Sequence, residues 1–147
     1  MKKISVFITA ILMLAFIIIP TNSVQAMGMN EIIKNVEQTN KQINSEIEKA
    51  VYAAQIITDD YNDDLIVLVN SKDNIANRNQ KKIQKLEDRH NAKIDEIINN
   101  LLQVTNKMAS ETINDAAKEG VTVYCEWVEV TLGGRIVLVD PLRIANE

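Results

Sequence analysis

The feature that most constrains the fold is a stretch of 91 residues, from Met29 to Glu119, that contains neither glycine nor proline. These two residues are the strongest breakers of regular structure, so a run of this length without either is typical of long helices. Within it, apolar residues recur at alternating steps of three and four, which keeps one helix face against a partner over many turns. The seam consists of Ile33, Val36, Asn40, Ile43, Ile47, Ala50, Ala54, Ile57, Tyr61, Asp64 and Leu68.

A second periodic segment follows the polar residues 70–74, Asn-Ser-Lys-Asp-Asn, whose side chains favour turns and helix caps. Gly120 comes directly after a basic last turn and is a typical helix stop. The sequence therefore predicts a long, coiled-coil-like antiparallel helical hairpin over residues 27–119, with its bend near 70–74. The second seam consists of Ile75, Asn79, Ile83, Leu86, His90, Ile94, Ile97, Leu101, Val104 and Met108, widened by Ile98, Leu102 and Thr105.

One alternative stays open inside the first helix. Residues 65–69, Leu-Ile-Val-Leu-Val, are five consecutive apolar residues between two polar pairs, a pattern that also fits a buried strand. The seam that runs through them favours a helix.

After Gly120 the pattern changes to that of a β-hairpin over residues 120–147, so the fold class is α+β. Residues 121–132 are rich in β-branched and aromatic side chains, Gly133-Gly134 fits a two-residue turn, and residues 135–139 form the return strand until Pro141 ends it. This turn places Val128 opposite Val139 and Val130 opposite Val137. One face then carries Val128, Val130, Leu132, Val137 and Val139, and the other carries Val121, Val123, Cys125, Trp127, Ile136, Leu138 and Leu142.

Both faces of this hairpin are apolar, yet a lone two-stranded hairpin is barely stable in water. The helices can cover one face, while the 65–69 segment, a second copy or another protein covers the second; alternatively, the helices wrap both faces. We therefore expect self-association or an envelope protein as partner. The predicted interaction residues are Trp127, Val128, Val130, Val137 and Val139.

The N-terminus has the pattern of a cleavable signal peptide over residues 1–26. Lys2 and Lys3 precede an apolar run that ends before Pro20, and Val24-Gln25-Ala26 offers a small-x-small cleavage site. The run is somewhat short for a bilayer span, so contact with a membrane is expected only if this segment is retained as an anchor. Cleavage would lower the basic residues from 16 to 14 against 20 acidic ones, a net charge of −6.

Charged clusters supply the candidate ligand sites. Asp59, Asp60, Asp63 and Asp64 place two carboxylate pairs at i,i+4, which could bind Ca²⁺ or Mg²⁺, but a calcium loop would also need a Gly and a closing Glu, so a solvated helix face is the favoured interpretation. The basic residues 81–90 either pair with this acidic segment across the hairpin or form an exposed face. The chain is net acidic, which argues against nucleic acid as a partner, and its single His and single Cys predict no cofactor.

The hairpin also resembles known sequences. Cys125-Glu126-Trp127-Val128-Glu129-Val130, the glycine turn and Val139-Asp140-Pro141 locally resemble the hairpin that carries the catalytic His and Asp of transglutaminase-like cysteine hydrolases. Cys125 stands where that family has its His, and no nucleophilic Cys precedes it, so the activity does not carry over. With the signal segment and the helical body, the hairpin also resembles small uncharacterised signal-peptide-bearing exported proteins of Gram-positive bacteria.

These patterns together predict a non-enzymatic structural or interaction protein, secreted or associated with the cell envelope. Two alternatives remain: a membrane-anchored envelope protein that keeps its N-terminal helix, and a small divalent-cation-binding module that uses the aspartates at 59–64.

Overall fold

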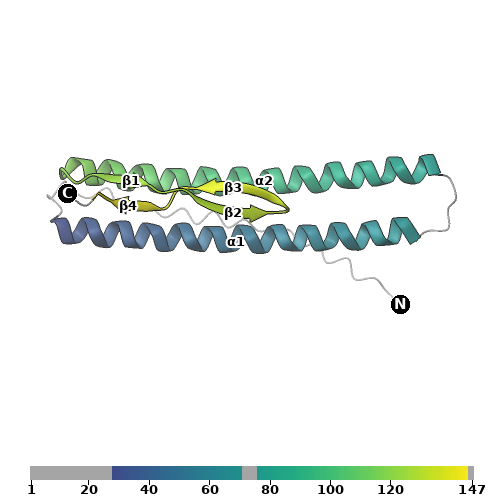
Figure 1. Cartoon of the computed structure of the whole chain (residues 1–147), viewed down its shortest axis with the longest axis horizontal. Helices are drawn as coiled ribbons and strands as arrows, with labels where there is room; N and C mark the ends of the chain where they lie inside the picture. The colour runs from purple at the N-terminus through teal and green to yellow at the C-terminus, as the bar shows by residue number, and fades with distance from the viewer. Residues whose placement is uncertain (1–27, 71–75, 146–147) are drawn as a thin grey trace.

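The computed structural model of the chain describes residues 28–70 and 76–145 and consists of two long antiparallel helices and a narrow β-ribbon (Figure 1). Helix α1 (Met29–Asn70) and helix α2 (Ala76–Lys118) contain 42 and 43 residues, so each is about 63 Å long. The predicted helical hairpin is therefore confirmed. The predicted signal segment and most of the predicted bend lie outside the described residues.

The predicted seam of α1 is largely the buried face of the helix. Val36, Ile43, Ala50 and Ala54 are buried, and residues 65–69 are helical, so the strand alternative for this segment is wrong. Two positions differ from the prediction. Ile32, which is four residues before Val36 and so shares its face, is buried in place of Ile33, and Asp64 is exposed.

Helix α2 ends where the sequence predicts, at a glycine. Gly120 has a φ of 74°, its N–H donates to the carbonyl of Ala117 at 3.1 Å, and the N–H of Val121 donates to the carbonyl of Ala116 at 3.0 Å. These two bonds form a Schellman motif, which satisfies carbonyls at the helix end and turns the chain back. The ribbon therefore runs back along the helices.

The ribbon is built from four short strands in two antiparallel pairs. Strand β2 (Val128–Leu132) pairs with β3 (Arg135–Val139), and β1 (Val123–Cys125) pairs with β4 (Leu142–Ile144). Val128 lies opposite Val139 and Val130 opposite Val137, as predicted. Gly133 and Gly134 have φ values of 55° and 80°, the positive pair that a tight hairpin turn needs. Pro141 does interrupt the return strand, but pairing resumes at Leu142.

Between its two halves the ribbon turns over. Strands β1 and β3 lie along α2, whereas β2 and β4 lie along α1 (Figure 1). The chain therefore crosses from one helix to the other between β1 and β2, and again between β3 and β4. Val123 and Leu142 face the helices in the first half, and Val130, Leu132, Val137 and Val139 face them in the second. Strict alternation along a flat ribbon predicts that Val123 and Leu142 lie on the face opposite to Val130, Leu132, Val137 and Val139. That prediction is wrong, because all six side chains face the helices.

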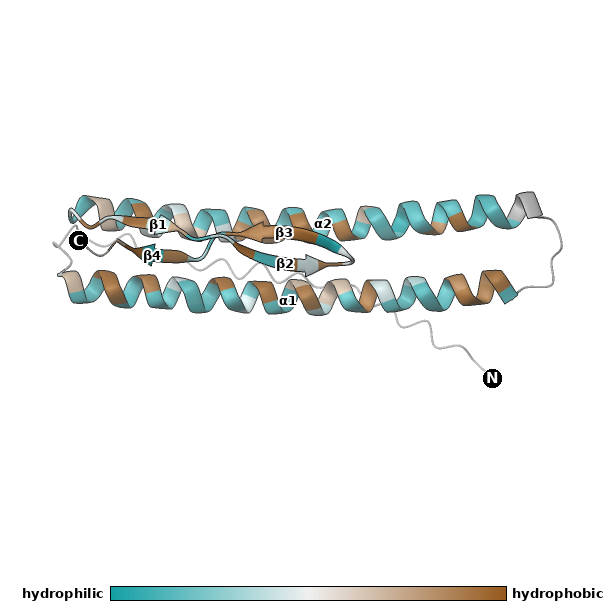
Figure 2. Cartoon of the chain, in the orientation of Figure 1, coloured by the Kyte–Doolittle hydropathy of each residue, from teal (hydrophilic) through white to brown (hydrophobic). Residues whose placement is uncertain are grey.

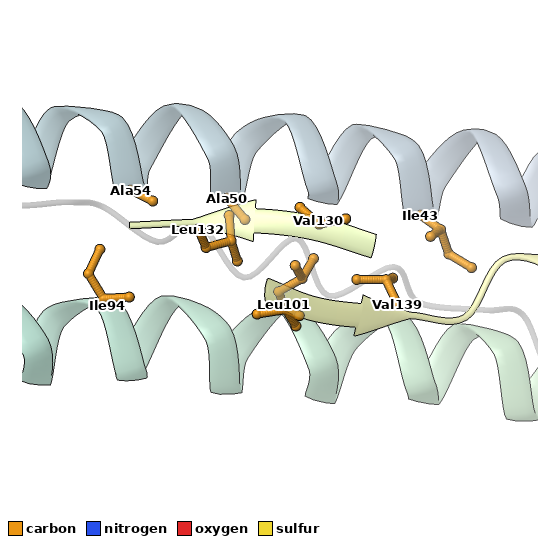
Figure 3. Close-up of a cluster of buried hydrophobic side chains, with 9 residues drawn as sticks. Ile43, Ala50, Ala54, Ile94, Leu101, Val130, Leu132 and Val139 are labelled. Atoms are coloured by element: carbon orange, nitrogen blue, oxygen red, sulfur yellow. The ribbon is translucent and has the colours of Figure 1, made fainter. Parts of the chain in front are cut away.

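The core lies where the ribbon sits over the groove between the helices (Figure 3). Brown, apolar segments of both helices face it in Figure 2. A second cluster under β1 and β4 contains Ile32, Val36, Ala109, Ala116, Val123 and Leu142. The main cluster contains Ile43, Ala50 and Ala54 of α1, Ile94 and Leu101 of α2, and Val130, Leu132, Val137 and Val139 of the ribbon.

Candidate functional site: the outer ribbon face

The ribbon exposes an apolar surface on the side away from the helices, which we call the outer ribbon face. Ile136 and Leu138 alternate with the buried Val137 and Val139, so their side chains must point outward. Trp127 lies where the ribbon turns over and is 68% exposed, and Ile136 is 69% exposed. The surface consists of Tyr124, Trp127, Ile136 and Leu138.

Polar residues accompany this apolar surface. Glu129 lies opposite Leu138 and Thr131 opposite Ile136 in the β2–β3 pair. The Arg143 guanidinium pairs with the Glu126 carboxylate across the ribbon, beside Tyr124. An apolar centre with a polar rim is the arrangement of a protein–protein interface.

Two side-chain anchors hold the ribbon on the helices. The Asn40 amide donates from Nδ2 to the carbonyl of Leu142 at 2.9 Å, and its Oδ1 accepts from the N–H of Leu142 at 2.7 Å. At the other end, Arg135 pairs with Asp95 and donates from Nη2 to Asn91 Oδ1 at 3.1 Å. The outer ribbon face is thus presented from a fixed support.

The structure divides the interaction residues predicted from the sequence. Trp127 lies on the outer ribbon face. Val128 is 45% exposed, but strand alternation places it on the helix-facing side of β2 together with Val130. Val130, Val137 and Val139 are buried against the helices, so a partner cannot reach them and their assignment is wrong. Sequence reasoning missed Tyr124, which the turning over of the ribbon carries outward.

The predicted cation site is not assembled. Asp59, Asp60, Asp63 and Asp64 are all exposed along α1, and Asp64 lies 3.5 Å from the Arg89 guanidinium. Within residues 28–70 and 76–145, no three His, Cys, Asp or Glu side chains converge as a metal site would require. The four aspartates are exposed side chains on α1.

The residues with nucleophile or base chemistry are used in packing. Cys125 is half-buried, and burial, aided by the charge of Asp140, raises the pKa of its thiol, which keeps the thiol protonated at neutral pH. His90 packs against Tyr61 in a tilted arrangement with ring centroids 4.6 Å apart, and its Nε2 lies 3.3 Å from Thr58 Oγ1. A catalytic thiol needs the opposite environment, a base or cation that stabilises the thiolate.

Comparison with protein families, with curated proteins and with solved structures found no match. In the part of the chain that the structure describes, no helix combines the length and apolar character needed to cross a bilayer.

Proposed function

We propose that this chain is an exported, non-enzymatic interaction protein that binds another protein of the cell envelope or extracellular space through its outer ribbon face. The observation that supports the proposal is that the apolar side chains of the outer ribbon face are exposed while the ribbon itself is held rigidly on the helices. Apolar side chains gathered in contact with water are unfavourable, and exposed apolar patches on single chains often mark binding sites.

The composition of the surface fits this role. Trp127 and Tyr124 bring large aromatic side chains with few rotatable bonds, the residue types that dominate binding energy in protein interfaces. The anchors at Asn40 and Arg135 pre-order the surface, so little conformational entropy is lost when a partner binds.

The exported location rests on the sequence of residues 1–26, with its dibasic start, apolar run and small-x-small end. The membrane-anchored protein is the second candidate, since the same run could be retained. N-terminal sequencing of the native protein separates the two: a chain that begins at Met27 supports export with cleavage, and an intact start supports the anchor.

Site-specific photo-crosslinking in the producing cell tests the interaction. A photoreactive amino acid at Ile136 should give one discrete crosslinked protein, and the same amino acid at Lys34, an exposed position near the start of α1, should not. The crosslink at position 136 should disappear when Trp127→Ser and Leu138→Ser are added. Equal crosslinking from both positions, or none from position 136, would contradict the proposal. Turnover of a substrate abolished by one point mutation would contradict the non-enzymatic assignment.

A further inference from the structure

The helical hairpin has a second face, opposite the ribbon, which we call the back face. Asn91 and Asp95 of α2 hold the ribbon through Arg135. Arg89 and Lys93 each precede one of these two residues by two positions, which corresponds to about 200° around the helix. The hollow that Arg89 and Lys93 line therefore opens on the side away from the ribbon.

The floor of this hollow is apolar. Leu86 is buried, while Ile57 and Tyr61 are half-buried between the two helices. On α1, Val67 continues the same side of the helix, because it lies three and four residues beyond Asp64 and Asp63, which also line the hollow. Val67 is 70% exposed, so apolar surface extends from the hollow toward the end of α1, where Figure 2 is brown.

The rim of the hollow separates the two signs of charge onto the two helices. Asp60 and Asp64 form an acidic row on α1, and Arg89 and Lys93 form a basic row on α2, both with i,i+4 spacing. The distance of 3.5 Å between Asp64 and Arg89 shows that the rows lie at the same level along the hairpin. Because the helices are antiparallel, Asp60 lies at the level of Lys93.

We propose that two copies of this chain associate through their back faces, with a two-fold axis parallel to the helices. This operation lays α1 of each copy over α2 of the other at the same level, so each acidic row meets a basic row and the apolar floors meet each other. The result is a four-helix arrangement in which each helix is antiparallel to its neighbours. This arrangement buries the apolar floors of both hollows between the helices.

A second copy of the chain fits this surface better than a partner whose surface carries charges of only one sign. An anionic surface would meet the acidic row, and a cationic one would meet the basic row, whereas the face is complementary to itself under the stated axis. A two-fold axis perpendicular to the helices would instead place acidic row on acidic row. The inference does not rest on the outer ribbon face, which points away from this contact in both copies.

Analytical ultracentrifugation of the chain that begins at Met27 tests the proposal, with charge-reversed variants. Arg89→Glu with Lys93→Glu makes both rows acidic, and Asp60→Lys with Asp64→Lys makes both rows basic. We expect the unaltered chain to dimerise and each variant alone to be at least about ten-fold weaker in dimerisation, because like charges face each other. An equimolar mixture of the two variants should form a heterodimer.

Three controls make the outcome decisive. Lys34→Glu with Lys41→Glu changes net charge equally at exposed positions near the start of α1 and should leave the dimer unchanged. Val67→Asn should weaken the dimer, whereas Val69→Asn, similarly exposed but about 200° away around α1, should not. Circular dichroism should show full helix content throughout. A monomeric unaltered chain, a dimer indifferent to the reversals, or a dimer lost with Trp127→Ser and Ile136→Ser would overturn the proposal.

Discussion

One polar side chain, Asn40, joins helix α1 to strand β4. The sequence places it as an interruption of an apolar seam, where a buried asparagine commonly sets register. In the structure its amide bonds to both the N–H and the carbonyl of Leu142, as a peptide group of a neighbouring strand would. Helix α1 thereby supplies a strand-like partner to β4, which sets where the ribbon lies along the helices.

Replacement of this side chain should cost stability out of proportion to its size. Asn40→Ala removes two hydrogen bonds and leaves the polar groups of Leu142 without their partner, so the free energy of unfolding should fall by about 2–3 kcal/mol. Asn44→Ala, one turn further along α1 at an exposed position, should change it by less than about 0.5 kcal/mol. Urea unfolding of both variants measures the difference, and equal losses would contradict the role of Asn40.

The two turn glycines should differ although both have positive φ. A Cβ on Gly133 would lie 2.6 Å from Cδ1 of the buried Ile94, whereas a Cβ on Gly134 meets nothing within 4 Å. Gly134→Ala should therefore cost about 1–2 kcal/mol from backbone strain alone, and Gly133→Ala about 1–3 kcal/mol more from overpacking. Thermal unfolding should show the difference, and the excess cost of Gly133→Ala should shrink in an Ile94→Val background.

The thiol of Cys125 should react slowly. Burial and then Asp140 raise its pKa, so at about pH 8 the folded chain holds less thiolate than the unfolded chain and iodoacetamide should alkylate it more slowly. Because the folded-state pKa lies above the unfolded value, the matching stability is fully present below the unfolded pKa and is lost as the pH rises through the folded-state pKa. Asp140→Asn removes the smaller cause and should raise the alkylation rate; an unchanged rate would assign the whole shift to burial.

At the scale of elements, the sequence predicted the helices and the hairpin register because both follow from local chemistry. The absence of breakers and the three-four spacing specify α1 and α2, and Gly133-Gly134 specifies which residues of β2 and β3 pair. What it could not predict is the turning over of the ribbon. The pairing offset is the same on both sides of residues 126–127, so the alternation of side chains there depends on twist, which follows from packing on the two helices.

The difference between local sequence pattern and tertiary packing also explains why only some of the predicted interaction residues are exposed. Val130, Val137 and Val139 share chemistry with exposed Val128, and only the position of the helices distinguishes the buried side chains from the exposed one. Pro141 was the one signal near the crossing, since proline cannot donate to a ladder. The partners of Asn40 and Arg135 lie 102 and 40 or more residues away, beyond any local pattern.

Alanine substitution on either side of the crossing tests the turned-over ribbon. A flat ribbon would place Leu142 and Ile136 on one face, whereas here Leu142 is 3% exposed and Ile136 is 69% exposed. Leu142→Ala should lower the free energy of unfolding by about 2–5 kcal/mol, and Ile136→Ala should change it by no more than about 0.5 kcal/mol. Similar losses in urea unfolding would mean that the ribbon does not turn over.

At the scale of the whole molecule, the ribbon supports only part of the helical hairpin. Its turn ends over Ile94, opposite the region of Ala54, and the main core ends there as well. Beyond this point Asn91 still accepts a hydrogen bond from Arg135, but no ribbon residue belongs to a buried cluster, and half-buried side chains such as Tyr61 and Leu65 take the place of a third layer. The uncovered part of the hairpin is also the part that carries the hollow and its two charged rows.

Amide hydrogen exchange should reveal this division. Segments 55–70 and 79–93 should exchange faster than 36–50 and 98–116, because helices with fewer buried contacts open locally at lower free energy. Mass spectrometry of peptic fragments resolves these segments in one experiment. If two copies pair by their back faces, protection of 57–64 and 86–93 should rise with protein concentration in the unaltered chain and stay constant in Arg89→Glu with Lys93→Glu. Uniform protection along both helices at low concentration would show that the ribbon is not what stabilises the covered half.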